Sequence, residues 1–405
     1  MKILQLCLKP PLPAKDGGCI AINNITEGLW ANGEEVHILS AVTHKHPFEA
    51  SAFSDEYLAK SQFEHVFIDT RLNLIDAFSC LITQDNYNIS RFFSPDFDRA
   101  LINKLLNNSY DIVHLESLFM TPYIATIRRY TKAKVVLRSH NLEYLIWERL
   151  AASANNKAKK TYLKYLAKQL KDYECKVLNL VDGVAAISMI DTKKYHKLGC
   201  RKPLRNIPFG INTNAYITSK QSEQEPSAQK AIKTLFHIGA MDWEPNKEGI
   251  GWFFQTVWPK VSKEFPELKL LLAGRGMDYY QPMYEQKNIT LVGEVEDAKT
   301  FMLNNDIMIV PILSAGGIRV KIIEGMALGK TIITTSVGAE GIDVINNKNI
   351  IIANSPDDFY QAIKKAVKHP EWSKTIGNKA QSYADEHFNN ELICKELIEF
   401  YRSLL

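Results

Sequence analysis

The chain has 405 residues, of which 46% are hydrophobic and 23% charged, a balance typical of a globular protein long enough for two domains. Its formal net charge of +4 is too small to favour nucleic acid as the main partner. The six cysteines form no CxxC pair and no Cys/His metal spacing, which favours a reduced chain in the cytoplasm over a disulfide or zinc framework.

Short apolar runs alternate with longer helical stretches along the whole chain. The first half contains KILQLCL, EVHILS, HVFID, DIVHLE, KVVLRS and GVAAIS, and the second half contains IKTLFHIG, LKLLLAG, NITLVG, DIMIVP, TIITTS and NIIIA. Runs without strict polar alternation are typical of strands buried on both faces, and their alternation with helices predicts α/β domains with parallel sheets. Several runs end in glycine, including Gly239 and Gly293, at the strand ends where such sheets bind ligands.

The polar stretch at 212–233 has no hydrophobic pattern and contains Pro226, which predicts a linker there. The expected domains are therefore residues 1–212 and 213–385. The amphipathic C-terminal segment, about 386–405, can pack on either domain, including a return to the first.

Two acidic clusters could be taken for metal ligands. Each follows a Ser-Pro pair, in SPDFD at 94–98 and in SPDD at 355–358. Serine, proline and then acids are the residues that favour the start of a helix, so we expect two capped helices and no metal ion.

The pair Gly17 and Gly18 lies between the first predicted strand and an amphipathic helix. Glycines at this position let backbone N–H groups approach a phosphate, and the helix dipole favours the anion. The alternative is a plain strand-to-helix turn, because no GxGxxG or GxxxxGK[ST] pattern accompanies the pair.

The segment SAGGIRVKIIEGMALG, at 314–329, combines a glycine turn with a helix. Backbone amides at Gly317 and Ile318, with the Arg319 guanidinium, are suited to a diphosphate. Lys321 and Glu324 share one helix face, so the alternative is a surface Lys–Glu pair beside a structural turn. Cations in a first turn oppose the helix dipole, and a bound anion removes that conflict, which favours an anion site.

Two polar residues follow predicted strands in the first half. His140 comes directly after KVVLRS, where an imidazole can contact a substrate hydroxyl or stabilise a leaving group; the alternative is a structural histidine. Ser188, in AAISMID, is either a helix cap or a neighbour of a phosphate.

The segment 157–174 predicts a basic helix whose Lys157–Lys171 face is a candidate contact for an anionic membrane surface or an acidic acceptor. A solvated helix face is the alternative. Four lysines recur at helical spacing along it: Lys160, Lys164, Lys168 and Lys171. No apolar run in the chain approaches the ~18 residues that a membrane span requires.

Taken in order, the motifs resemble the retaining glycosyltransferases of family 4, which have the GT-B fold. The matching stretches are the early GG loop, NGEEVHILS, DIVHLES, RSHNLE, AAIS, FGIN, HIGAMDWEPN, GEVEDAKTFMLNNDIMIVP and IIEGMALGKTIITTSVGAEG. The resemblance implies two Rossmann-like, doubly wound domains facing across a cleft. It also implies transfer of a sugar, with retention, from a nucleotide diphosphate sugar to a glycan or lipid-linked acceptor in surface polysaccharide synthesis. No metal or other cofactor is implied, and the expected location is cytoplasmic or peripheral at the inner face of the membrane.

The resemblance also assigns roles to residues. Glu324 matches the carboxylate that binds the donor ribose, and His140 matches a histidine near the transferred sugar. Backbone around the diphosphate is assigned to the N-terminal glycine pair and to the later turn. The donor-binding positions are Gly17, Gly18, Gly239, Lys247, Gly293, Val295, Gly316, Gly317, Ile318 and Glu324. The expected catalytic residues are His140, Arg319 and Lys321.

The chain departs from the usual family pattern in two places. Gly316 stands eight residues before Glu324, where the family has a second glutamate. The loop GAMDWEPNK replaces a GR…K loop, so that Met241 or Asp242 occupies the place of the arginine. A variant branch of the family pairs this loop with GGxRxK, and the resemblance then implies that the cations come from the later segment.

Three other functions fit the same fold. A nucleotide-sugar epimerase or a phosphorylase would use the same donor site, and a non-catalytic donor-binding subunit would explain Gly316. A dehydrogenase is disfavoured because neither half carries the dinucleotide glycine pattern.

Overall fold

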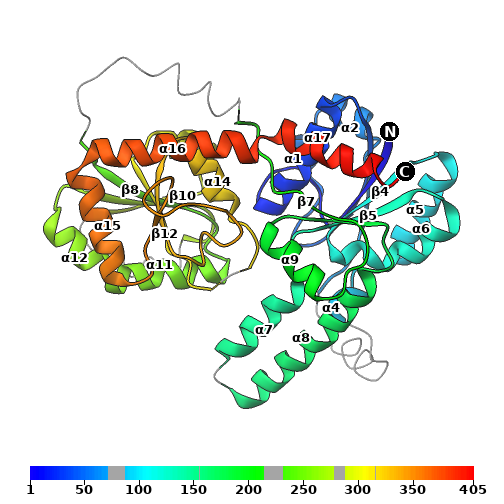
Figure 1. Cartoon of the computed structure of the whole chain (residues 1–405), viewed down its shortest axis with the longest axis horizontal. Coiled ribbons are helices and arrows are strands. Elements are labelled where there is room, and N and C mark those ends of the chain that lie inside the picture. Colours follow the sequence, from blue (N-terminus) through cyan, green and yellow to red (C-terminus); the bar gives the residue numbers. More distant parts are fainter. Residues whose placement is uncertain (72–86, 155, 214–230, 278–287, 315) are drawn as a thin grey trace. The chain divides into compact units, whose positions relative to one another are not determined.

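The computed structural model describes residues 1–71, 87–154, 156–213, 231–277, 288–314 and 316–405. These residues form two compact units (Figure 1). Unit 1 consists of Met1–Gly210 together with Asn390–Leu405, and unit 2 consists of Ile211–Asn389. Most of the expected linker, at 214–230, lies outside the described residues.

Unit 1 is built on a seven-stranded sheet whose neighbouring strands are all parallel. In spatial order the strands are β3 (Glu64–Phe67), β2 (Glu35–Val42), β1 (Lys2–Cys7), β4 (Ile112–Glu116), β5 (Lys134–Ser139), β6 (Gly183–Ala186) and β7 (Leu204–Asn206). This order confirms a doubly wound sheet. Its strand order reverses between β1 and β4, which is the point where such sheets bind ligands.

Both faces of this sheet are covered, as the continuous apolar runs predict. Side chains alternate between the faces along each strand, so Ile3 and Leu4 of β1 belong to different hydrophobic clusters. The helices of unit 1 are α1 (Gly17–Ala31), α2 (Asp55–Ser61), α4 (Tyr87–Ser90), α5 (Pro95–Asn107), α6 (Ile124–Tyr130), α7 (Glu143–Ser153), α8 (Lys157–Val177), α9 (Met189–Lys197) and α17 (Asn390–Arg402), with short 3₁₀ turns at Ala50–Ala52 and Leu118–Tyr123.

The C-terminal helix α17 returns to unit 1 and packs on α1. The Asn390 side chain donates to the Asn24 carbonyl at 2.6 Å, and a Cβ on Gly28 would lie 2.3 Å from the Cys394 sulfur. Glycine at position 28 therefore permits the close approach of the two helices.

Unit 2 has a six-stranded parallel sheet. Its strands, in spatial order, are β10 (Ile289–Gly293), β9 (Lys269–Ala273), β8 (Thr234–Ile238), β11 (Ile307–Val310), β12 (Thr331–Thr334) and β13 (Ile351–Ile352). Its order reverses between β8 and β11, so the second switch point lies there.

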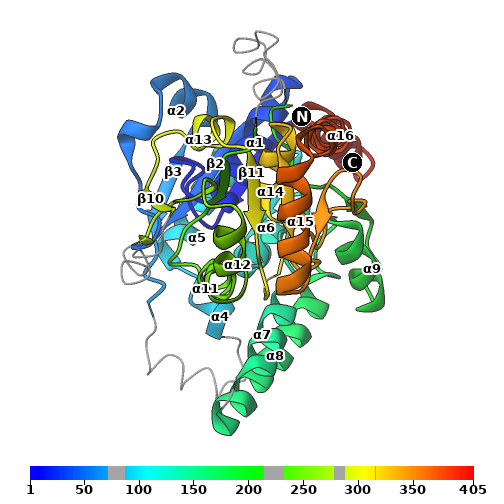
Figure 2. The ribbon, with the colours of Figure 1, turned by 90° about the vertical axis from the view of Figure 1, so that its left-hand side faces the viewer.

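Helices also cover both faces of the second sheet (Figure 2). The helices α11, α12 and α15 share one hydrophobic cluster with Leu235 and Ile309, whereas Gly325 of α14 packs against Met308 and Ile332 on the other face. The helices of unit 2 are α11 (Glu244–Thr256), α12 (Trp258–Glu264), α13 (Ala298–Leu303), α14 (Val320–Ala327), α15 (Pro356–Lys368) and α16 (Pro370–Phe388).

The predicted helix starts are confirmed. Ser94 caps α5, with Pro95 in its first turn, and Ser355 forms a capping box with Asp358 at the start of α15. Ser188 also acts as a cap, because its hydroxyl accepts from the Asp191 amide at 3.0 Å. None of the helices in the described ranges is long and apolar enough to cross a membrane.

Two glycines of α11 provide a matched test of packing. A Cβ on Gly249 would lie 1.9 Å from the Pro311 carbonyl oxygen, whereas a Cβ on Gly251 would meet nothing within 4 Å. We expect Gly249→Ala to lower the free energy of unfolding by about 1–3 kcal/mol through overpacking. Gly251→Ala should leave it unchanged or raise it by up to about 1 kcal/mol through helix propensity. Urea denaturation measures both changes, and equal effects would contradict the close contact between α11 and the end of β11.

Candidate functional site

In the glycine turn of unit 2, the buried guanidinium of Arg319 folds back onto the backbone of the turn. Arg319 occupies the N-cap position of α14, one residue before the helix begins, without a capping hydrogen bond from its side chain, and it is 4% exposed. Its Nη1 donates to the Gly316 carbonyl at 2.5 Å. Gly317 has a φ of +76°, a conformation that favours glycine, so the tight turn requires this residue.

Lys321, in the first turn of α14, connects this segment to the DWEPN loop. Its ammonium donates to Asn246 Oδ1 at 2.9 Å and to His237 Nε2 at 3.3 Å. A Cβ on Gly239 would lie 2.4 Å from Lys321 Nζ, so only glycine leaves room for the ammonium. The two motifs are therefore parts of one site. The alternative of a Lys–Glu surface pair does not describe this lysine, whose hydrogen bonds go to neutral groups.

His237 is completely buried near the carboxyl end of β8. Its Nδ1 lies 2.8 Å from the Ile309 carbonyl, which can only accept, so Nδ1 carries the hydrogen and Nε2 presents its lone pair to Lys321. Burial and the neighbouring ammonium hold the pKa of His237 well below its ordinary value, and the ring is neutral. Sequence reasoning missed this residue, although a histidine inside the apolar run TLFHI was its signal.

Arg319 and Lys321 bring two basic side chains to the carboxyl edge of unit 2. Burial, assisted by the charge of Arg319, lowers the pKa of Lys321 to about 7, while Glu324 opposes the shift. Glu324 is partly buried on the same helix, α14. A partly buried cation that is held by neutral acceptors keeps its electrostatic field for a ligand, so this edge is suited to an anion.

The other predicted donor positions lie in loops along the same sheet. Lys247 follows Asn246 in the first turn of α11 and is partly buried. Gly293 ends β10 with a φ of +75°, and Val295 follows it, partly buried. Because all strands are parallel, Gly293 lies at the same edge of the sheet as Gly239, with β9 between their strands.

The two residues at the place of the family arginine have different roles. Met241 is 1% exposed and belongs to the hydrophobic core, so it does not line the site. Asp242 pairs with Arg275 at 2.8 Å, and both side chains are exposed. Arg275 comes from the loop after β9, where the sequence AGRG was the missed signal for a further cation.

In unit 1, the Asp16 carboxylate accepts hydrogen bonds from the backbone amides of the first glycine loop. It caps α1, and its Oδ1 accepts from the amides of Gly18 and Cys19 at 2.9 and 3.0 Å. Lys9 Nζ lies 2.6 Å from the same oxygen, and a Cβ on Gly18 would lie 2.6 Å from that nitrogen. Gly17 begins the helix. The Gly18 amide therefore serves the cap in this structure, and a side chain at position 18 would displace the end of Lys9.

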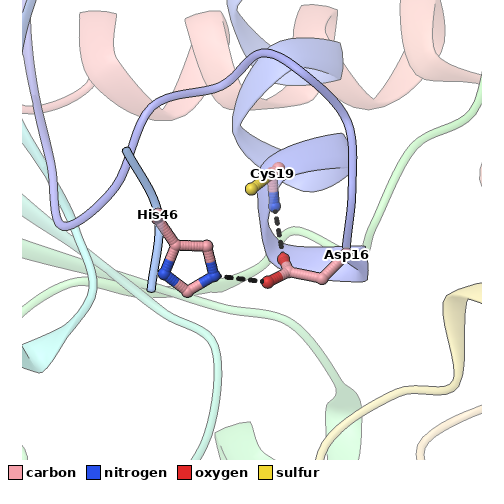
Figure 3. Close-up of side chains that lie close together, drawn as sticks. All are labelled: Asp16, Cys19 and His46. Atoms are coloured by element: carbon pink, nitrogen blue, oxygen red, sulfur yellow. Dashed lines mark hydrogen bonds and ion pairs between the residues drawn. The ribbon is translucent and has the colours of Figure 1, made fainter. Parts of the chain in front are cut away.

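Asp16, Cys19 and His46 lie close enough together to resemble a metal site (Figure 3). Each Asp16 oxygen already pairs with Lys9, and His46 Nε2 lies 2.9 Å from Oδ2. Burial raises the pKa of the Cys19 thiol to about 12, so this sulfur stays protonated at neutral pH. A carboxylate paired with an ammonium and a protonated thiol are unsuited to ligate a metal ion. We therefore interpret the cluster as a salt-bridged helix cap.

His140 follows β5 and is oriented by a buried carboxylate. Its Nε2 lies 2.7 Å from Glu116 Oε2, and Glu116 has no exposed surface. Gln5 donates to the other carboxylate oxygen at 2.9 Å, and His114 Nε2 lies 3.0 Å from it. Glu116 ends β4 at the switch point of the sheet, and sequence reasoning missed it although DIVHLE places an acid at the end of an apolar strand.

The contact with Glu116 determines which ring nitrogen of His140 carries the hydrogen. Burial lowers the pKa of His140, so the ring is neutral at pH 7 even though Glu116 opposes the shift. Burial alone would raise the pKa of Glu116, but His114, His140 and Arg138 hold it well below its usual range. Nε2 therefore donates to the carboxylate, and Nδ1 is the ring atom able to accept from a ligand hydroxyl.

The helices α7 and α8 pair with each other and extend away from the sheet of unit 1 (Figure 1). The leucines of α8 at 163, 166 and 170 are buried, as the helical spacing predicts. No acid occurs between Arg149 and Lys171 in the sequence. Exposed residues in this stretch include Lys157, Lys159, Lys164 and Lys168, together with Leu150, Tyr162 and Tyr165.

Two family models match consecutive parts of the chain. The one described as Glycosyltransferase Family 4 matches residues 17–215, and the one described as Glycosyl transferases group 1 matches residues 232–369. The second range lies within unit 2, and the first covers most of the main segment of unit 1. The chain is built from the two domains of a GT-B glycosyltransferase.

Known proteins resemble this glycosyltransferase along its whole length. Sucrose-phosphate synthase from Thermosynechococcus elongatus aligns with a TM-score of 0.71 and 16% identity, covering 100% of this chain and 99% of its own. Anabaena HepE in complex with UDP aligns with a TM-score of 0.66 and 14% identity, covering 100% of both chains. An uncharacterized 44.6 kDa protein in the cps region of Klebsiella pneumoniae is 24% identical, covering 98% of this chain and 99% of that protein. The solved structures support the two-domain GT-B fold.

The buried carboxylate of this glycosyltransferase gives a stability test. We expect Glu116→Gln to lower the free energy of unfolding by about 3 kcal/mol at pH 7, because Arg138, 1% exposed, keeps its charge without the carboxylate. Glu49→Gln, which breaks the exposed pair with Lys15, should cost less than about 1 kcal/mol. Chemical denaturation at several pH values measures both.

The pH dependence has a definite sign. Since the folded-state pKa of Glu116 is lowered, its stabilisation is present above its unfolded pKa of about 4.3 and is lost as the pH falls through the folded value. The difference between wild type and Glu116→Gln should therefore be largest near neutral pH. A difference that grows on acidification would contradict the ionised carboxylate.

Proposed function

We propose that the chain is a retaining glycosyltransferase that moves a sugar from a nucleotide diphosphate sugar to a glycan or lipid-linked acceptor. The observation that carries the proposal is the pair of cations, Arg319 and Lys321, at the carboxyl edge of unit 2. Related GT-B structures support it, since HepE has been solved with UDP and with UDP-glucose. The Klebsiella relative lies in a cps region, which supports a role in polysaccharide synthesis.

The residues of unit 2 would bind the donor. Arg319 and the ammonium of Lys321 would stabilise the charge that develops on the diphosphate as the sugar–oxygen bond breaks. The amides of Gly317 and Ile318 would add hydrogen bonds, and Glu324 would accept from the ribose hydroxyls. Arg319 and the protonated form of Lys321 would supply the positive charge that a leaving diphosphate needs, so the proposal includes no metal ion.

The transfer would proceed on the front face of the sugar without a protein nucleophile. The acceptor hydroxyl forms the new bond to the anomeric carbon as the bond to the diphosphate breaks, and its proton passes to the departing phosphate oxygen. His140 would orient the sugar, because its Nδ1 accepts from a hydroxyl while Glu116 holds Nε2. This assigns His140 an orienting role rather than that of a general acid.

Gly316 favours a second candidate function. The family places a carboxylate there to hold the donor sugar, and glycine provides no side chain for that contact. A non-catalytic donor-binding subunit would bind nucleotide sugars yet transfer none of them to any acceptor.

The helix pair α7–α8 suggests where a lipid-linked acceptor would be met. We propose that its basic stretch lies on an anionic membrane surface, with Tyr162 and Tyr165 at the headgroup level. The exposed lysines and the lack of acids between Arg149 and Lys171 support this contact.

Donor binding and the role of Arg319 can be tested together. A thermal-shift screen of nucleotide sugars should identify one donor that raises the apparent stability, because a ligand of the folded state stabilises it by mass action. With that donor, Arg319→Ala should lower kcat/KM by about 10²–10³-fold. Lys260→Ala, which removes an exposed cation of the same unit, should leave kcat/KM unchanged. An unchanged value for Arg319→Ala would remove its leaving-group role, and an inverted product would overturn retention.

The membrane contact predicts an effect of charge reversal. Each lysine near an anionic surface contributes about 1 kcal/mol, so Lys159→Glu/Lys164→Glu should weaken binding to phosphatidylglycerol vesicles at least thirtyfold, roughly. The matched control, Lys374→Glu/Lys379→Glu, changes two exposed lysines of α16. Vesicle co-sedimentation measures both, and equal losses would refute a contact localised to α7–α8.

A further inference from the structure

We propose that His237 is a positioning residue which, together with Asn246, aims the Lys321 ammonium at the donor diphosphate and makes donor binding depend on the protonation of that lysine. The inference rests on the proposed function, and it assigns a role to a buried histidine that never needs to touch the substrate. It explains why unit 2 holds a polar side chain inside the apolar strand β8.

The ring of His237 is fixed at both nitrogens. Nδ1–H donates to the Ile309 carbonyl of β11, the neighbouring strand, at 2.8 Å. This bond commits Nε2 to be an acceptor, and Nε2 lies 3.3 Å from Lys321 Nζ. The position of the ammonium is thereby tied to the sheet at its switch point between β8 and β11.

Asn246 supplies the second fixed acceptor. Its amide nitrogen donates to the Ala240 carbonyl at 2.7 Å, which turns Oδ1 toward Lys321 at 2.9 Å. Two of the three ammonium hydrogens are then held by neutral groups. Neutral acceptors fix the direction of a charge without cancelling it, whereas a carboxylate in either place would form an ion pair and weaken the attraction for a diphosphate.

The charges that face Lys321 make its protonation responsive to a ligand. Arg319 precedes it on the chain and disfavours a second cation, Glu324 favours it, and His237 is neutral. Burial is the largest cause of the lowered pKa of Lys321, about 7, so near neutral pH the free protein contains both charge states. A diphosphate beside Nζ favours the ammonium, and binding then takes up a proton.

The sign of the pH effect follows directly. Below about pH 7 Lys321 is already charged and donor affinity should be constant. Above it, each unit of pH should weaken binding by about tenfold, until the pH reaches the raised pKa of the complex. The diphosphate diester of a nucleotide sugar does not change its charge in this range, and the bases begin to ionise only at its upper end, so a loss of affinity between pH 7.5 and 8.5 belongs to the protein.

The test uses the full chain with UDP-glucose and GDP-mannose as probes. Calorimetry from pH 6 to 9, in two buffers of different ionisation enthalpy, measures affinity and proton uptake together. The wild type should lose affinity for at least one probe by about tenfold between pH 7.5 and 8.5, with proton uptake. Lys321→Met should bind more weakly and lose both the pH dependence and the proton uptake, which identifies the titrating group.

Variants of His237 separate positioning from folding. His237→Leu removes the acceptor and should weaken binding about tenfold at pH 7 and shift the midpoint of the pH profile, whereas His237→Gln keeps an acceptor oxygen and should recover part of the affinity. His37→Leu is the matched control, since His37 is equally buried, in β2, and bonded to Tyr110. It should lower stability without moving the profile.

Different outcomes test the role of His237, the proton linkage and the proposed donor binding. A His237→Leu variant that is folded and binds with the wild-type affinity and pH profile would overturn the positioning role. Wild-type binding that is independent of pH would overturn the proton linkage while the donor site stands. Failure of the wild type to bind either probe, or any donor from the thermal-shift screen, at any pH would overturn the proposed function itself.

Discussion

A lysine held by neutral acceptors is the interaction on which the carboxyl edge of unit 2 depends. Lys321 reaches from α14 to Asn246 of α11 and to His237 of β8, so three segments distant in the sequence meet at one nitrogen. A Cβ on Gly239 would lie 2.4 Å from that nitrogen, so a side chain there would displace it. The same contact joins the DWEPN and GGIRVK segments, because Asn246 of the first supplies an oriented acceptor for the amine of Lys321 in the second.

Unit 1 handles charge in the opposite way. Glu116, at the switch point between β1 and β4, is a buried anion surrounded by His114, His140, Arg138 and Gln5. The carboxylate compensates its neighbours and fixes the proton of His140. In unit 2 the Lys321 amine is instead held by two neutral acceptors, Asn246 and His237. Under the proposed function, the edge of unit 1 would orient a sugar hydroxyl and the edge of unit 2 would bind the diphosphate.

Much of the fold followed from local patterns. Apolar runs such as KILQLCL became parallel strands buried on both faces, and Ser94 and Ser355 began the helices that their Ser-Pro-acid sequences predicted. These features depend on neighbours within a few residues of the chain, where periodicity and capping preferences are informative. Arg319 and Lys321 stood out for the same reason, as two cations at the wrong end of a helix.

The partners of those residues could not be predicted in this way. Periodicity marks His237 only as a polar residue in an apolar strand, and Gly18 only as a helix-start glycine whose amide turned out to serve Asp16. The sequence by itself determined the parallel α/β architecture, the helix starts and the cationic character of the 314–329 segment, because these arise from short-range chemistry. Tertiary structure alone decided which acceptors hold Lys321 and which carboxylate orients His140, because parallel strands far apart in the chain bring these side chains together.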